Sequence, residues 1–166
     1  MHKQVSSRLS AGGSPGKLAQ YTRILANQGV NIRSIGGAEW DGHGAVALLV
    51  DDGVDENVLI DALNGEGFPS TLIYAAEAVL FDREGALADA CEAIGDLNIA
   101  SILVADTHGG YGLVTFGFES EADAEEALTR LGDIAVPPHT LTAAWQAHEQ
   151  WDRENPNQPP PNPSEQ

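Results

Sequence analysis

The sequence predicts an α+β fold made of two ferredoxin-like βαββαβ modules in tandem, with antiparallel sheets and the helices on one face. Two observations predict it. The chain contains an internal repeat, whose clearest block is NIRSI at Asn31–Ile35 and NIASI at Asn98–Ile102. Each copy also alternates β-rich and helix-periodic segments in the order strand, helix, strand, strand, helix, strand. A repeated block of this kind indicates one supersecondary unit used twice.

The first half of the first copy predicts a strand, a loop and a helix. The strand is expected near Gln4–Ser10. Ser14 and Pro15 are expected to start the helix, because serine caps helices and proline suits their first position. Gly29 is typical of the residue that follows a helix end. The apolar residues between them recur at helical spacing and predict one buried face: Leu18, Tyr21, Ile24 and Leu25.

The rest of the first copy predicts a hairpin, a helix and a last strand. The β-rich segments Val30–Trp40 and Ala45–Val50 are joined by Asp41-Gly42-His43-Gly44, which is a hairpin signal. Asp55 can cap the second helix, and Phe68–Tyr74 is the expected last strand.

The second copy predicts the same order of elements. They are a strand at Ala78–Phe81, a helix through Leu87–Ile94, strands at Leu97–Ala105 and Gly112–Phe118, and a helix capped by Ser120. The last strand of this copy is expected at a sheet edge, because Pro137 and Pro138 cannot donate to a strand ladder.

These elements divide the chain into residues 1–75 and 76–141 as the two modules, 142–154 as a C-terminal helix and 155–166 as a disordered, proline-rich tail. Each module is near the lower size limit for folding alone. We therefore expect the two to share an interface, with their sheets joined edge to edge or packed face to face.

Composition excludes several classes of function. The 166 residues include 25 Asp and Glu against 8 Lys and Arg, a net charge of −17, which argues against nucleic acid or an anionic membrane as partner. No charged-then-apolar leader and no apolar run of membrane-spanning length is found. The only cysteine, Cys91, excludes an internal disulfide. The sequence predicts a cytoplasmic protein.

One motif carries a resemblance to a known family. The segment SPGKLA at Ser14–Ala19, followed by LANQGVNI at Leu25–Ile32, resembles the opening of an ACT domain, a βαββαβ module that often binds amino acids and regulates metabolic enzymes. The resemblance implies a ligand site at the seam between modules, where the turn Ser14–Lys17 faces the strand start of a neighbouring module. The residues that it implies for ligand binding are Ser14, Pro15, Gly16, Lys17, Asn31, Ile32, Gly85, Asn98 and Ile99.

The chemistry of these residues suits an amino acid. Gly16 allows close approach to the backbone, free N–H groups at a helix start suit a carboxylate, and Asn31 offers both a donor and an acceptor. The alternative is that glycine and asparagine serve only their turns. In the second copy Glu84 replaces the proline, which argues against anion binding there.

The leading interpretation is a regulatory sensor that binds an amino acid, without catalytic residues, cofactor or metal. Exposed sheet edges predict a homo-oligomer. Two alternatives remain open: an assembly module for a partner enzyme, and an enzyme that uses His43 and His108, both in Asp-x-His-Gly turns. Against a metal at these turns, one Asp and one His are fewer than the four ligands of a closed site.

Overall fold

The computed structural model describes residues 2–9, 16–41, 43–51, 53–108, 110–137, 142–143, 146–147, 150–151 and 153–155. Its elements are β1 (His2–Leu9), α1 (Lys17–Asn27), β2 (Ile32–Trp40), β3 (His43–Val50), α2 (Glu56–Gly65), β4 (Ser70–Phe81), α3 (Ala86–Ile94), β5 (Ser101–His108), β6 (Tyr111–Phe118) and α4 (Glu121–Leu131). The strands form a six-stranded antiparallel sheet in the order β2-β3-β1-β4-β6-β5.

Both halves have the predicted ferredoxin-like arrangement. In the first half the order β2-β3-β1-β4 places the outer strands beside the two inner ones, with α1 and α2 packed on one face. In the second half β5, β6 and the end of β4 form the equivalent sheet under α3 and α4. The fourth strand of this half is reduced to one bridge, in which the Val136 N–H donates to the Val79 carbonyl at 2.8 Å.

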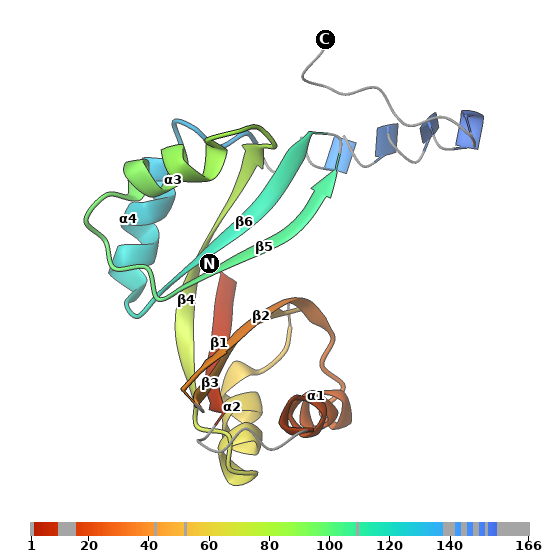
Figure 1. Ribbon diagram of the computed structural model, residues 1–166, viewed down its shortest axis with the longest axis vertical. Coiled ribbons are helices and arrows are strands. Elements are labelled where there is room, and N and C mark those ends of the chain that lie inside the picture. The colour runs from red at the N-terminus through yellow and green to blue at the C-terminus, as the bar shows by residue number, and fades with distance from the viewer. Residues whose placement is uncertain are drawn as a thin grey trace.

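The two halves share a strand. We expected separate strands at Phe68–Tyr74 and Ala78–Phe81, but β4 runs unbroken from Ser70 to Phe81. Figure 1 shows it passing from the α1 and α2 end of the molecule to the α3 and α4 end. Nothing between the two predicted segments breaks a strand, because Ala75, Ala76 and Glu77 include neither glycine nor proline. Of the two junctions that we left open, edge to edge or face to face, the first is therefore present as a continuous strand.

Helix α1 begins later than predicted. Its first residue is Lys17 and its N-cap is Gly16, which has a φ of +93° and no side chain to cap with. This left-handed conformation is open to glycine and prevents a helix from running through from Pro15. Gly85 does the same before α3, with a φ of +84°. The predicted stop at Gly29 is confirmed, since it follows α1 with a φ of +70°.

Helix α2 has the predicted cap. One oxygen of the Asp55 carboxylate accepts hydrogen bonds from the N–H groups of Asn57 at 3.0 Å and Val58 at 3.3 Å. Replacing Asp55 with alanine leaves both donors without this acceptor, so we expect the free energy of unfolding to fall by about 1 kcal/mol. Urea denaturation measures this change. Asp61→Ala, in the exposed middle of the same helix, should change stability by less than half as much.

Each pair of helices covers its own apolar core. The first core joins Tyr21 and Leu25 of α1 to the inward side chains of β1, β3 and α2, and Tyr21 meets Phe68 edge to face with ring centroids 5.4 Å apart. The second core centres on Phe116 and Phe118 of β6 under α3 and α4. The helical periodicity predicted Tyr21 and Leu25 correctly, whereas Leu18, on the same predicted stripe, is exposed.

A third buried layer lies on the sheet face that carries no helix. The side chains of Leu49, Ile73 and Leu103 are almost fully buried, yet they belong to neither helix-covered core. The sheet is twisted so that β2 lies against β5. A Cβ added to Gly36 would stand 2.8 Å from the Leu103 Cδ2, so the two strands are in close contact. The halves are thus joined both through β4 and face to face.

A polar group sits beside this layer. Arg33 of β2 lies 3.8 Å from the Glu77 carboxylate of β4, and the Thr115 hydroxyl of β6 donates to the same carboxylate at 3.4 Å. Glu77 is mostly buried, and Thr115 is fully buried. Through Glu77 these contacts link β2 of the first half to β6 of the second.

Beyond α4 the description is partial. The described residues between 142 and 154 are helical, in the range predicted for the C-terminal helix. The predicted tail lies outside the described residues, apart from Asn155. No helix in the described part of the chain has both the length and the apolar character needed to cross a bilayer.

Candidate functional site

A cavity of about 700 Å³ lies where the two halves meet. The first half contributes the end of α2, the Pro69 turn and the first residues of β4; the second half contributes the loop before β5 and the residue after β6. Its lining residues are Asn64, Pro69, Ser70, Thr71, Leu72, Ile73, Asn98, Ala100 and Glu119. The volume lies within the range of small-molecule sites in proteins.

The cavity exists because β6 is shorter than β4. Pairing between them begins at Tyr74 with Phe118, and β6 ends there. The preceding residues of β4, from Ser70 to Ile73, pair with β1 on one side only. On the other side, the described part of the chain provides no strand beside them. The chain instead turns away through Glu119, which leaves an open space against the sheet edge.

Asn64 completes one end of this edge. Its side-chain oxygen accepts from the Ser70 N–H at 2.8 Å, and its amide group lies 3.5 Å from the Ser70 carbonyl oxygen. A side-chain amide therefore pairs with Ser70 much as a neighbouring strand would. It also anchors the end of α2 to the start of β4, which shapes the cavity wall.

Asn98 is the predicted site residue that the structure places in this cavity. It is exposed and stands just before β5. Its neighbour Ile99 packs instead against the second core, which holds the loop in place. The other lining residues were not predicted. For those on β4, Ser70–Ile73, the signal is the long β-rich run from residue 70 to 81, which we predicted as two separate strands.

Asn31, the repeat counterpart of Asn98, has a different environment. Its side-chain amide donates to the Asp51 carboxylate at 2.9 Å, and the backbone carbonyl of Asn31 accepts from the Asp51 N–H at 3.3 Å. The Asn31 side-chain amide is thus bonded to a carboxylate 20 residues further along the chain, rather than to backbone groups of its own turn. Ile32 packs against the first core.

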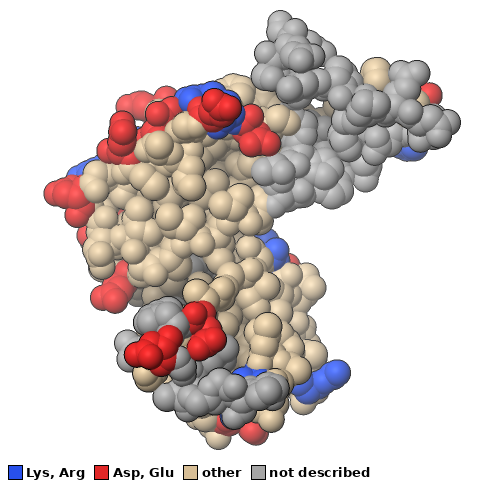
Figure 2. Space-filling model, viewed as in Figure 1, with Lys and Arg blue, Asp and Glu red and all other residues tan. Residues whose placement is uncertain are grey.

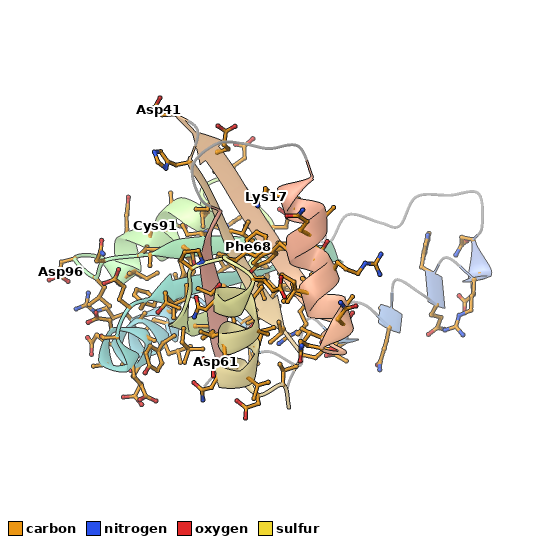
Figure 3. All side chains as sticks on the ribbon, turned by 90° about the horizontal axis from the view of Figure 1, so that it is seen from below. Lys17, Asp41, Asp61, Phe68, Cys91 and Asp96 are labelled. Carbon is orange, nitrogen blue, oxygen red and sulfur yellow. The ribbon has the colours of Figure 1, made fainter. Side chains whose placement is uncertain are left out.

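The predicted residues at the start of α1 lie on another part of the first half. Ser14 and Pro15 are outside the described residues. Gly16 is exposed, and a Cβ added there would meet no atom within 4 Å. The Lys17 ammonium stands 5.6 Å from the centre of the Phe68 ring, a cation–π contact that Figure 3 shows beside α1.

The start of α3, where Gly85 is located, is occupied by an ion pair. Arg83 pairs with Asp89 of the first turn, and a Cβ added to Gly85 would stand 3.7 Å from the Arg83 guanidinium. The Arg83 guanidinium and the Asp89 carboxylate thus already pair with each other at this helix start.

The Asp-x-His-Gly turns do not form a cluster in the part of the chain that is described. His43 starts β3, and Asp41 lies at the tip of the hairpin, well away from Lys17 and Phe68 in Figure 3. The side chain of His108 is outside the described residues. Among the described residues, no group of three His, Cys, Asp or Glu side chains could hold a metal ion.

An exposed ion-pair network joins α3 to α4. The Arg130 guanidinium donates to Asp96 at 3.0 Å and to Glu126 at 2.9 Å, and it also reaches the Ile94 carbonyl at the end of α3. The hydrogen bond from Arg130 holds the pKa of Asp96 below its ordinary value, and the bond to Asp96 raises the pKa of Arg130. This network is structural.

The network predicts a loss of stability in acid. Because the pKa of Asp96 is lower in the folded protein, the pair stabilises the fold above the ordinary carboxyl pKa and stops doing so as pH falls through the lowered value. We expect the melting temperature of Asp96→Asn to be lower than that of the native chain at pH 6. The difference should shrink toward pH 2, and a constant difference would contradict this assignment.

Comparison with solved structures supports the fold. A protein from Bacteroides thetaiotaomicron superimposes with a TM-score of 0.62 at 18% identity, covering 81% of this chain and 90% of the other. The ligand-free regulatory subunit of aspartate kinase from Thermus thermophilus, an ACT-domain protein, gives a TM-score of 0.58 at 18% identity and covers 80% and 91%. The chain has an ACT-type fold.

A third match, a putative C-terminal regulatory domain of aspartate kinase from Porphyromonas gingivalis, has a TM-score of 0.52 at 12% identity and covers 82% of this chain and 93% of that one. Each match spans both halves of the chain, so the tandem arrangement as well as the module is shared. The predicted resemblance is confirmed at the level of fold. No family sequence model and no curated protein matches the chain.

Proposed function

We propose that this chain is a regulatory sensor that binds an amino acid at the junction of its two ACT-type halves. The observation that carries the proposal is the cavity, because one wall comes from β4 of the first half and the other from Asn98 and Glu119 of the second. The aspartate kinase matches support a regulatory role, since they are named as regulatory subunits or domains.

A ligand in this position can act without catalysing a reaction. It touches both halves at once, so it favours the arrangement in which the two walls have the correct separation. Because the ligand binds one arrangement of the halves more tightly than the other, it changes the contacts that the chain makes with other copies or with a partner enzyme. In this proposal the protein acts in the cytoplasm and needs no cofactor.

Isothermal titration calorimetry with the twenty common amino acids tests the proposal, and at least one should bind. Asn98→Ala should weaken the binding of that amino acid by about fivefold, the effect of one lost hydrogen bond. Asn31→Ala should leave its affinity unchanged, because the Asn31 amide is held by Asp51 outside the cavity. The proposed site is contradicted if no amino acid gives a heat of binding. It is also contradicted if Asn31→Ala, and not Asn98→Ala, loses affinity.

A role in assembly is favoured by a separate observation. Two leucines and two isoleucines occupy corresponding places in the repeat and are 41–52% exposed: Leu18 and Leu87 on α1 and α3, Ile35 and Ile102 on β2 and β5. Figure 2 shows a broad area without charged side chains over β5 and β6, next to acidic residues over α3 and α4. In a chain of charge −17, such an area is where two copies can approach without repulsion.

Analytical ultracentrifugation tests this second role. We expect the native chain to sediment as a homo-oligomer and Ile102→Glu to sediment as a smaller species, because a buried carboxylate without a partner is costly. Val58→Glu, on an exposed position of α2 outside these pairs, is the control and should keep the native mass. A monomeric native chain would rule out the role.

A further inference from the structure

The cavity contains an open strand edge. Main-chain N–H and C=O groups of alternate residues in a strand point to the same side. Ser70 points its N–H toward Asn64, which lines the cavity, so Leu72 points its N–H and C=O into the same space. Among the described residues no strand pairs with Leu72 on this side, and its carbonyl receives only a long contact, 3.4 Å, from the Thr71 hydroxyl.

The opposite edge of β4 shows what such a gap accepts. There the pairing of β4 with β1 reaches Ala75, and the following residues of β4 do not pair with β1. The chain places its own extended segment at Val136 in that gap, where the Val136 N–H donates to the Val79 carbonyl at 2.8 Å. At each gap, the described neighbouring strand pairs with only part of β4. At Leu72 the described residues supply no equivalent segment.

The charge of the cavity favours a bound residue that has a positive side chain. Glu119 is the charged side chain among the lining residues described, and no Lys or Arg accompanies it. A positive side chain bound here gains attraction from Glu119, and the surrounding charge of −17 adds to it at longer range. A negative group would be repelled by the same carboxylate.

We propose that this edge binds a positively charged amino-acid residue in extended conformation, with its N–H and C=O paired to Leu72 and its side chain directed to Glu119. The inference rests on the proposed function, since it names what the ligand of that cavity presents. Either a free amino acid or one residue of a partner's peptide segment supplies this chemistry, and strand addition of the second kind is a known recognition mode.

The test uses the full chain and four probes in calorimetric titration. They are free L-arginine, Nα-acetyl-L-arginine N-methylamide as a peptide residue, the corresponding leucine derivative, and the arginine derivative methylated on its own backbone nitrogen. We expect an arginine probe to bind, the leucine derivative to bind about fivefold more weakly, and backbone methylation to weaken binding by a similar factor. Tighter binding of free arginine identifies a free amino acid as the source, and tighter binding of the blocked form identifies a peptide segment.

Matched variants separate this inference from the function on which it rests. Glu119→Gln should remove the preference for arginine over leucine, while Glu121→Gln, two residues further on at the exposed start of α4, should leave it intact. If leucine and arginine probes bind equally to the native chain, or Glu119→Gln keeps the preference, the inference is overturned and amino acid binding stands. If no amino acid or derivative binds, the proposed function fails as well.

Discussion

Replacing Phe116 with alanine is expected to lower the free energy of unfolding by about 3–5 kcal/mol, the range measured when a fully buried phenylalanine is truncated. The Phe116 side chain has 0% exposure and lies in the second core, which α3 and α4 cover. It stands on β6, between β4 and β5, so no flexible edge can move in to fill the space. Denaturation in urea, followed by circular dichroism, measures the change.

Phe81→Ala is the matched control for Phe116. Phe81 is 51% exposed at the end of β4 and stacks on Tyr111 with ring centroids 5.1 Å apart. Its loss removes one aromatic pair and little buried area, so a decrease of about 1 kcal/mol is expected. Equal losses for both variants would show that the second core is not packed as described.

The second large effect is expected at Leu103, where alanine should lower the free energy of unfolding by about 2–4 kcal/mol. Leu103 is 3% exposed, although it points away from both helix pairs. Its burial comes from the contact with β2 of the other half. The next residue, Val104, is 57% exposed, so Val104→Ala is the control and should change stability by about 0.5 kcal/mol or less.

A double-mutant cycle shows whether the two halves are in contact at this point. Gly36→Ala alone should be destabilising, because the new Cβ would stand 2.8 Å from the Leu103 Cδ2. In the Leu103→Ala background that atom is absent, so the same substitution should be tolerated. Additive effects of the two changes would mean that β2 and β5 do not pack together.

Much of the fold could be predicted from local patterns. The repeat predicted two units of the same kind, and the helical spacing of Tyr21 and Leu25 predicted which side of α1 is buried. The Ser120 cap is confirmed, since its hydroxyl accepts from the Asp123 N–H at 3.1 Å. Such features depend on residues a few positions apart, so the sequence carries them directly. The predicted start of α1 was two residues too early. Ser14 and Pro15 suit a helix start, but the helix begins at Lys17, after Gly16.

The candidate site could be predicted only in part. Asn31 and Asn98 open nearly identical segments, NIRSI and NIASI, and local reasoning treats them alike. In the folded chain Asn31 is bonded to Asp51, whereas Asn98 lines the cavity beside β4. The difference comes from what each residue meets across the sheet, which sequence spacing does not contain.

The sequence by itself determined the two modules, their order of elements and most of their buried helix faces, because hydrophobic periodicity and capping act over one or two turns of chain. Tertiary structure alone decided that the modules share β4, that Gly36 meets Leu103, and that a gap opens beside Leu72. These features depend on where one strand ends relative to another far along the chain. Strand register is set by the packing of whole faces rather than by neighbouring residues.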